Sequence, residues 1–162
     1  MNNVTLRKLN KEDKMIIFGW ISDPALRKMT GTKEKPTIDS HNQWFMEKFH
    51  NESGYYRIIE YAEKPVGFMG TNTVDLHNNS AEIFIYIGTK EYRRRGIAKE
   101  AVKLYIDLLH YEGNICKIYA RVFSFNAASI SLFEKCGFTL EGNQSDHKDT
   151  YTDLLWFGMT LP

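Results

Sequence analysis

The stretch that decides the fold is residues 91–101, which read EYRRRGIAKEA. An apolar, strand-like run precedes it at residues 83–87, and a helix-like run follows it from Ala98 to His110. A helix start carries unpaired backbone N–H groups and the positive end of the helix dipole, and both attract an anion. Gly96 lets the backbone approach a bulky ligand closely, and three preceding arginines supply donors for phosphate oxygens. The stretch therefore predicts a site for a ligand that contains a pyrophosphate.

Composition places the chain among globular proteins. Of its 162 residues, 43% are hydrophobic and 25% are charged, which suits one domain with a sizeable core rather than a disordered segment. The net charge of +1 argues against a protein whose main task is to bind nucleic acid. The N-terminus lacks the apolar core of a signal peptide, and no apolar run reaches membrane-spanning length. We therefore expect a cytoplasmic protein with neither nucleic-acid nor membrane partners.

The two cysteines, Cys116 and Cys136, lie in apolar contexts and show no metal-ligand spacing. Two buried thiols are therefore expected rather than a disulfide, in keeping with a reducing cytosol. Both cysteines lie at the ends of expected elements, remote from residues 91–101. The sequence thus predicts neither a metal site nor a cysteine nucleophile beside the glycine turn.

The first half of the chain reads as a strand, two helices and three strands. The expected elements are a strand at residues 4–9, a helix at 11–21, a turn at Asp23-Pro24, a polar loop at 30–36, a second helix capped by Ser40, and strands at 55–61, 65–74 and 81–88. The turn at Glu63-Lys64 joins the first two of these later strands into a hairpin.

The second half alternates helices with strands. The expected elements are a helix at residues 96–111 stopped by Gly113, a strand at 115–123, a helix from an Asn126 cap to Cys136 with Gly137 as its C-terminal glycine, strands at 138–141 and 151–161, and a loop at 142–150 between them. This order predicts an α/β (α+β) fold in a single domain, 1–162. Its central twisted sheet would be mixed and mostly antiparallel, with about seven strands flanked by four helices.

Two segments of the second half resemble the GNAT N-acetyltransferases. Arg93-x-x-Gly96-x-Ala98 matches the family's acetyl-CoA signature Q/R-x-x-G-x-G/A. Residues 126–138, NAASISLFEKCGF, match its second segment, N-x-x-A/S-x-x-L-Y/F-E-K-x-G-F, at the usual separation. The first signature alone is weak, but the pair is specific. The resemblance implies the GNAT fold, with a splay between its fourth and fifth strands, and an acetyl-CoA-dependent N-acetyltransferase.

The resemblance extends to a branch of the family. Residues 20–27 and 41–45 are similar to the RimJ/RimL-like N-terminal acetyltransferases and also to the acetyltransferases of sugar-nucleotide amines. The acceptor implied is a primary amine, either a protein N-terminus or an amino sugar. A small-molecule or peptide acceptor and a monomer or homodimer are therefore expected.

The resemblance also implies where acetyl-CoA binds. It places the pyrophosphate on the backbone N–H groups of the glycine turn, at Arg93, Arg94, Arg95, Gly96, Ile97, Ala98 and Lys99. The amide-bearing pantetheine arm would pair with the open edge of the fourth strand, at Ile85, Tyr86 and Ile87, facing residues 118–121. Asn126 would add a hydrogen bond to this arm, although an asparagine that only caps a helix needs no such role. Phe133 belongs to the same segment and is counted among the cofactor-binding positions.

The catalytic positions depart from the family at one point. Many members have a tyrosine where this chain has Phe133, and that tyrosine protonates the departing thiolate. Phenylalanine has no proton to give, so Ser129 or water would take the role. Glu82, at the start of the fourth strand, is the preferred general base, against the alternative of an exposed strand glutamate. The departure at Phe133 also leaves open a catalytically inactive CoA-binding module.

Three residues are candidates for the acceptor pocket: His41, Trp44 and Tyr86. His41 is also a second candidate base, although most lone histidines are structural. Aromatic residues at helical or strand spacing more often belong to a core. The expected reaction is direct attack of a neutral amine on the thioester, helped mainly by positioning and by a backbone N–H that polarises the carbonyl. No metal is implied.

Overall fold

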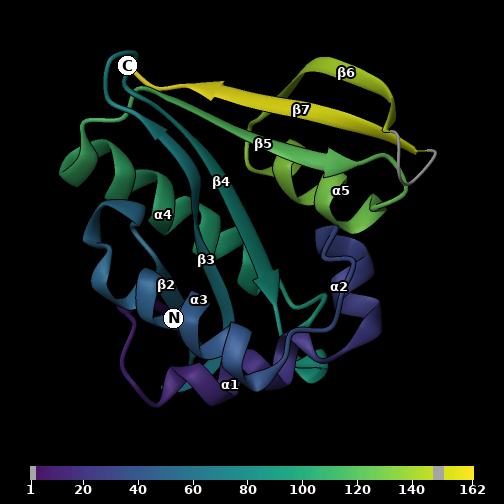
Figure 1. Cartoon of the computed structure of the whole chain (residues 1–162). Helices are drawn as coiled ribbons and strands as arrows, with labels where there is room; N and C mark the ends of the chain where they lie inside the picture. Colours follow the sequence, from purple (N-terminus) through teal and green to yellow (C-terminus); the bar gives the residue numbers. More distant parts are fainter. Residues whose placement is uncertain (1–2, 148–151) are drawn as a thin grey trace. The chain divides into compact units, whose positions relative to one another are not determined.

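The computed structural model describes residues 3–147 and 152–162 (Figure 1). Contacts divide the chain into two compact units, each of which is described by itself. Unit 1 comprises Met1–Gly70 and Ile85–Ala101, and unit 2 comprises Thr71–Phe84 and Val102–Pro162. The chain crosses between the units inside β3, β4 and α4. A single domain over the whole chain stays a prediction.

The described residues contain five α-helices, two 3-10 helices and seven strands. In order these are β1 (Val4–Lys8), α1 (Asp13–Ile21), α2 (Pro24–Thr30), α3 (Ile38–His50), η1 (Glu52–Gly54), β2 (Arg57–Tyr61), β3 (Lys64–Asp75), β4 (Ser80–Ile87), η2 (Lys90–Tyr92), α4 (Ile97–Gly113), β5 (Lys117–Phe123), α5 (Ala127–Lys135), β6 (Thr139–His147) and β7 (Thr152–Thr160). Every predicted strand is present, although most boundaries differ by one to three residues.

The strands form one sheet in the order β1-β2-β3-β4-β5-β7-β6. The pairs β1–β2, β2–β3, β5–β7 and β6–β7 are antiparallel, whereas β4 and β5 are parallel. The predicted mixed, mostly antiparallel sheet is therefore confirmed. The described parallel ladder runs from Ser80 opposite Lys117 to Glu82 opposite Tyr119, while β4 continues to Ile87. The splay expected between the fourth and fifth strands stays a prediction.

The expectation of four helices is wrong, because α2 occupies the place of the predicted turn. The Oδ1 atom of Asp23 accepts a hydrogen bond from the backbone N–H of Ala25 at 2.9 Å, and Pro24 stands at the first helical position. Aspartate is a good N-cap, and proline loses nothing at a helix start, where its missing N–H would have had no intrahelical acceptor. Asp23-Pro24 thus begins a helix as well as ending the previous segment.

Three other boundaries also need correction. Ser40 lies inside α3, whose cap is Thr37: the two residues form a capping box, with the Ser40 N–H donating to Thr37 Oγ1 at 3.0 Å. Gly113 is the last residue of α4, and Asn114 takes the left-handed conformation that ends it, with φ of 52°. The described part of the predicted loop at 142–150 belongs to β6, and residues 148–150 lie outside the described residues.

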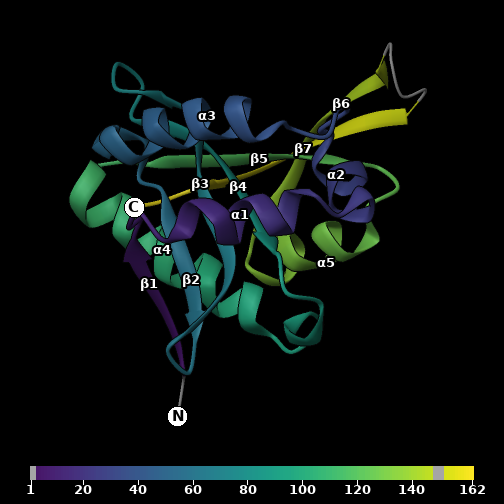
Figure 2. The ribbon, with the colours of Figure 1, turned by 60° about the horizontal axis from the view of Figure 1, so that its bottom comes forward.

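In unit 1, α1 and α3 lie side by side (Figures 1 and 2). Aromatic side chains of both helices pack in one cluster with aromatic side chains of β3 and β4. Phe68 is the centre of this cluster, with its ring near those of Trp44, Tyr56 and Tyr86. Its side chain is buried, so the cluster is a core rather than a surface patch. The cluster fixes the two helices to the strand that leads into the glycine turn.

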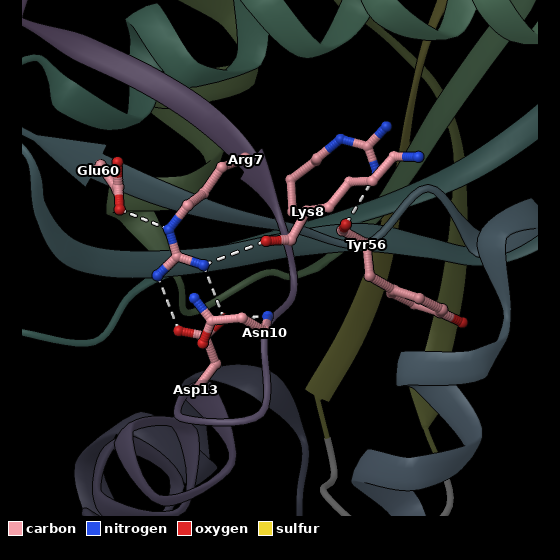
Figure 3. Close-up of polar contacts among 7 residues, drawn as sticks. Arg7, Lys8, Asn10, Asp13, Tyr56 and Glu60 are labelled. Carbon is pink, nitrogen blue, oxygen red and sulfur yellow. Dashed lines mark hydrogen bonds and ion pairs between the residues drawn. The ribbon is translucent and has the colours of Figure 1, made fainter.

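The start of α1 is held by an ion-pair cluster between β1, β2 and the helix (Figure 3). The guanidinium of Arg7 donates to both carboxylate oxygens of Asp13 at 2.8 Å, and its Nε atom donates to Glu60. Asp13 is completely buried and also accepts from the backbone N–H of Asn10 at 2.7 Å. A buried carboxylate is tolerated when it is paired and fully hydrogen-bonded in this way.

In unit 2, β5, β7 and β6 form a three-stranded segment with α5 on one face (Figure 1). Phe133 of α5 packs against Phe157 of β7, which places the core on this face. Side chains alternate along a strand, so the next residue, Trp156, lies on the opposite face. There its ring stacks on Tyr119, and the Arg121 guanidinium lies over it. Unit 2 therefore has one apolar face and one polar, aromatic face.

Candidate active site

The turn between β4 and α4 is open at its glycine. Gly96 has a φ of 78°, which L side chains rarely adopt, and a Cβ placed there would meet no atom within 4 Å. α4 begins at Ile97, and the N–H groups at a helix start point out of the helix along its axis. Gly96 has no side chain with which to cap them. The turn combines room for a ligand with N–H donors and the positive end of the helix dipole.

Arg93 differs from the other two arginines of the signature, because its guanidinium bonds to the protein. Its Nε atom donates to the carbonyl oxygen of Ile87 at 2.8 Å, and Nη2 donates to that of Gly88 at 3.2 Å. The side chain is partly buried. Arg93 thus ties the turn back to the last carbonyl groups of β4.

Arg94 and Arg95 are exposed. Arg94 has a φ of 60° and Gly96 a φ of 78°, so two left-handed positions flank Arg95 in this turn. The guanidinium carbon of Arg95 lies 5.0 Å from the ring centroid of Tyr61 and 5.2 Å from that of Tyr92. These are cation–π distances, so the two rings restrict the Arg95 side chain while leaving it accessible.

The beginning of the turn is anchored to β3 and α1. The N–H groups of Gly88 and Thr89 both donate to the carbonyl oxygen of Val66, at 2.8 and 3.2 Å. The indole N–H of Trp20 donates to the Thr89 hydroxyl at 3.2 Å. A Cβ on Gly88 would lie 2.1 Å from the Trp20 ring, so only glycine allows this packing. Sequence reasoning treated Trp20 as an apolar helix position and missed its contact with the turn.

The three β4 residues of the predicted pantetheine edge differ in burial. Ile87 is buried, and Ile85 and Tyr86 are half-buried. The Tyr86 ring meets the rings of Trp20 and Phe68 edge to face, and burial raises the pKa of its hydroxyl above the ordinary value. Tyr86 therefore presents a neutral hydroxyl within an aromatic cluster. Pairing of this edge with pantetheine, and its approach to residues 118–121, stay predictions.

Glu82, the predicted base, is buried and ion-paired. It is 3% exposed, so the alternative of an exposed strand glutamate is wrong. Arg121 donates from Nε to one carboxylate oxygen and from Nη2 to the other, the second at 3.2 Å, and the Thr73 hydroxyl lies 3.5 Å from that oxygen. Sequence reasoning missed Arg121, because only the strand register brings it beside Glu82. The catalytic role of Glu82 stays a prediction.

The N-cap predicted at Asn126 is confirmed. Its Oδ1 atom accepts a hydrogen bond from the Ser129 N–H at 3.2 Å, and the residue is 8% exposed. Ser129 itself is half-buried in the first turn of α5. The cap uses the carbonyl oxygen of the Asn126 amide, and the NH₂ group of the same side chain would be the donor to a carbonyl of pantetheine. The contacts expected of Asn126 and Ser129 with the cofactor stay predictions.

Phe133 lies in the core of unit 2. It is 3% exposed and its ring packs against those of Phe138 and Phe157, with centroids 5.1 and 6.5 Å away. The position that carries a tyrosine in many family members is therefore filled here by an apolar core side chain. A contact between Phe133 and the cofactor stays a prediction.

His41 is packed in the core of unit 1. It is 2% exposed, its Nε2 atom shares a 2.7 Å hydrogen bond with the Lys14 carbonyl, and its ring stacks on Trp44. A carbonyl only accepts, so this nitrogen carries the proton. Burial lowers the pKa of His41 below its ordinary value, which keeps the ring neutral. The structural reading of His41 fits these contacts, and Trp44 packs between it and Phe68. Their acceptor roles stay predictions.

Three further findings concern the described part of the chain. Cys116 and Cys136 are not in a disulfide, as predicted, although both are half-buried rather than buried. Residues 3–147 and 152–162 contain no group of three or more histidine, cysteine, aspartate or glutamate side chains arranged to hold a metal ion. Within the same ranges, no helix has the length and apolar character needed to cross a membrane.

Comparison with known proteins identifies the family. A model of the acetyltransferase (GNAT) domain matches residues 3–139. The chain is 30% identical over 161 residues to the SPbeta prophage-derived uncharacterized N-acetyltransferase YokL of Bacillus subtilis, covering 98% of this chain and 90% of that protein. It is 24% identical over 143 residues to a spermidine N(1)-acetyltransferase of Vibrio cholerae, covering 88% of this chain and 82% of that protein. The crystal structure of spermidine N-acetyltransferase from Vibrio cholerae, in complex with CoA and spermine, superimposes with a TM-score of 0.88 at 23% identity, covering 98% and 95% of the two chains. The fold, the glycine turn and these matches together show that the chain belongs to the GNAT acetyltransferases, a family of N-acetyltransferase enzymes.

Proposed function

We propose that this protein transfers an acetyl group from acetyl-CoA to a primary amine of a small molecule, with the CoA diphosphate at the start of α4. The observation that carries the proposal is the open glycine turn: Gly96 at φ 78°, with no atom within 4 Å of a Cβ placed there. A diphosphate is bulky and anionic, so it needs both the space and the donors of such a turn. Membership of the GNAT family supports acetyl-CoA as the anionic ligand.

The diphosphate and the pantetheine arm of this ligand would be bound by different residues. The N–H groups of Ile97, Ala98 and Lys99 would bind the diphosphate oxygens. The exposed guanidinium groups of Arg94 and Arg95 would add charge-assisted donors. The amino group of Asn126 would bind the pantetheine arm.

The reaction proposed is direct attack of a neutral amine on the thioester carbonyl. A tetrahedral intermediate forms as the nitrogen bonds to the carbonyl carbon, and the carbon–sulfur bond then breaks. A backbone N–H of β4 would stabilise the oxyanion, and the amine proton would pass to a base. Glu82 is proposed as this base, although both of its oxygens already accept from Arg121, so the incoming proton has to compete with those bonds.

The departing thiolate needs either a proton or a stabilising donor. Phe133 offers none, because it is an apolar side chain in the core of unit 2. Ser129 is proposed to donate to the sulfur, with water as the alternative. A CoA thiolate leaves readily near neutral pH because thiols titrate at about pH 8.5. A missing tyrosine therefore slows this step without blocking it.

The acceptor proposed for testing first is a polyamine. The relatives of Vibrio cholerae that match this chain carry spermidine in their names, which supports a small, flexible primary amine. Protein N-termini and amino sugars, the acceptors indicated by the RimJ/RimL-like resemblance, remain the second group. The groups differ chemically, since an alkylamine titrates at about pH 10.4, like lysine, and an α-amino group at about pH 8. A polyamine acceptor therefore requires a base more strongly.

The decisive experiment measures CoA release from acetyl-CoA with a panel of acceptors at fixed concentration. The panel contains spermidine and spermine, UDP-amino sugars, aminoglycosides and short peptides with unblocked N-termini. Turnover with one group and not the others identifies the acceptor class. Stabilisation by CoA without turnover on any amine would favour the inactive CoA-binding module. Absence of both binding and turnover would contradict the proposal.

The proposal also includes a reducing compartment, the cytoplasm, which agrees with two cysteines that form no disulfide. A monomer or homodimer is proposed for the assembly. Light scattering after size-exclusion chromatography tests the assembly directly, with and without CoA.

A further inference from the structure

The first arginine of the glycine turn bonds to the protein rather than pointing outward. We infer that Arg93 is a positioning residue, which shapes the CoA-binding turn through two backbone carbonyl groups and does not bind the diphosphate itself. The inference rests on the proposed function, because it concerns the same turn. It assigns Arg93 a role that differs from those of Arg94 and Arg95.

Arg93 donates three hydrogen bonds to carbonyl oxygens of the preceding six residues. Its Nε and Nη2 atoms donate to the carbonyl oxygens of Ile87 and Gly88, at 2.8 and 3.2 Å. Its backbone N–H donates to the carbonyl oxygen of Lys90 at 3.1 Å. A guanidinium presents its N–H groups in a rigid fork, so one side chain can fix two successive carbonyl groups. The turn is thereby held against the end of β4.

The same segment is held from its other side by β3. The N–H groups of Gly88 and Thr89 donate to the carbonyl oxygen of Val66. Arg93 thus fixes the carbonyl groups of Ile87 and Gly88, and the Val66 carbonyl fixes the N–H groups of Gly88 and Thr89. Arg93 therefore fixes the spacing between two predicted cofactor contacts, the strand edge at Ile85–Ile87 and the helix start at Ile97. Preorganised donors of this kind bind an anion without paying for reorganisation when it arrives.

The other two arginines of the turn, Arg94 and Arg95, remain accessible to a phosphate group. Arg94 and Arg95 are exposed, and Arg95 is steadied by the rings of Tyr61 and Tyr92. Arg93 is only partly exposed, and its Nε atom and one terminal nitrogen are engaged. The inference predicts that Arg93 matters through its hydrogen bonds, whereas its neighbours matter through their charge.

Two substitutions separate these roles, because each keeps one property of Arg93 and removes the other. Arg93→Gln loses the charge but places an amide nitrogen where Nε stood, so it can still donate to the Ile87 carbonyl. Arg93→Lys keeps the charge but places a methylene at that position and loses the fork. A phosphate contact would be preserved by lysine and lost with glutamine. A positioning contact reverses that order.

The test measures the dissociation constant of CoA by calorimetry for both variants and the wild type. We expect Arg93→Gln to bind within about threefold of the wild type and Arg93→Lys to bind about tenfold more weakly. Arg94→Met serves as the matched control, and it should reduce the salt dependence of CoA binding, which both Arg93 variants should retain. Tighter binding by the lysine variant than by the glutamine variant, or equal binding by both, would overturn the inference.

A second measurement separates failure of the inference from failure of the proposed function. Amide hydrogen exchange of residues 87–96, without any ligand, reports whether the turn keeps its hydrogen bonds. We expect wild-type protection in Arg93→Gln and faster exchange in Arg93→Lys, with melting temperatures within a few degrees of each other. Should the wild type not bind CoA, the proposed function fails while this exchange pattern still decides the role of Arg93. Equal exchange in the two variants would contradict it.

Discussion

The start of α4 and the polar groups of unit 2 differ in whether side chains of the protein already bond to them. At α4 the preceding residue is Gly96, which has no side chain to cap the helix. In unit 2 the candidate groups already have protein partners: Asn126 caps α5, and Glu82 is bonded to Arg121. The difference teaches that the proposed diphosphate site needs no side chain to move away, whereas the proposed catalytic groups must exchange partners before they can act.

The largest effect should come from closing the open helix start. Gly96→Glu places a strained side chain and a negative charge where the diphosphate is proposed to lie, so we expect acetyl-CoA affinity to fall by at least about a hundredfold. Calorimetry checks the affinity. Gly19→Glu is the control, because it makes the same charge change at an exposed position of α1, a glycine with open space around its Cβ position. Unchanged affinity in Gly96→Glu would remove the turn from the site.

The second effect sharpens the contrast on the catalytic side. Glu82→Gln keeps the shape of the side chain but cannot take a proton, so we expect kcat to fall by about a hundredfold while the dissociation constant of acetyl-CoA stays within about threefold. The pH–rate profile is the measurement, since the limb that reports the base should disappear. Arg121→Lys is the control that perturbs the ion pair and keeps the carboxylate. A wild-type pH profile in Glu82→Gln would exclude this residue as the base.

The third prediction asks whether Asn126 only caps its helix. Aspartate caps a helix about as well as asparagine does, but it has no NH₂ group to donate to pantetheine. Alanine can neither cap the helix nor donate that bond. We expect Asn126→Asp to keep the melting temperature within about 1–2 °C and to weaken CoA binding by about threefold to tenfold, and Asn126→Ala to lose about 1 kcal/mol of stability as well. Thermal melts with and without CoA measure both properties. Wild-type CoA affinity in the aspartate variant would leave Asn126 as a cap alone.

The smallest effect concerns a group engaged inside unit 1. Burial lowers the pKa of His41 below 6.5, so the unfolded chain binds a proton more readily than the folded chain as the pH falls. The stability that His41 contributes is therefore complete above its unfolded pKa and is lost as the pH falls through the folded value. Between about pH 7.5 and about pH 5.5 we expect the melting temperature to fall by about 2–4 °C more in the wild type than in His41→Gln. Parallel pH dependences would show that His41 is not the titrating group.

The features that the sequence predicted best are those that depend only on residues close together in the chain. Asn126 at a helix start and Gly137 at the helix end follow from cap preferences, and the structure has both, with Gly137 at a φ of 93°. Gly96 was informative for the same reason, since its conformation and the next helix start depend only on neighbouring residues. Local rules were also available where the prediction failed. Asp23-Pro24 has the N-cap and first-turn preferences of a helix, and Thr37 lies three residues before Ser40, as a capping box requires.

The partners of the polar groups could not be predicted, because they depend on which strands meet and in which register. Glu82 and Arg121 are 39 residues apart, and only the parallel pairing of β4 with β5 brings them together. Arg7, Asp13 and Glu60 meet for the same reason, across β1, β2 and α1 (Figure 3). A sequence gives the side chains but not the long-range pairing that turns an isolated carboxylate into an ion pair.

The packing of Trp20 against Gly88 makes Trp20 an intrinsic fluorescent probe of the turn between β4 and α4. The indole N–H bonds to Thr89 and the ring lies directly on the backbone that leads to Gly96. Indole emission is sensitive to the polarity and hydrogen bonding of its surroundings. With Trp44 and Trp156 replaced by phenylalanine, the fluorescence of Trp20 should follow cofactor arrival in real time, without a label and without an acceptor amine.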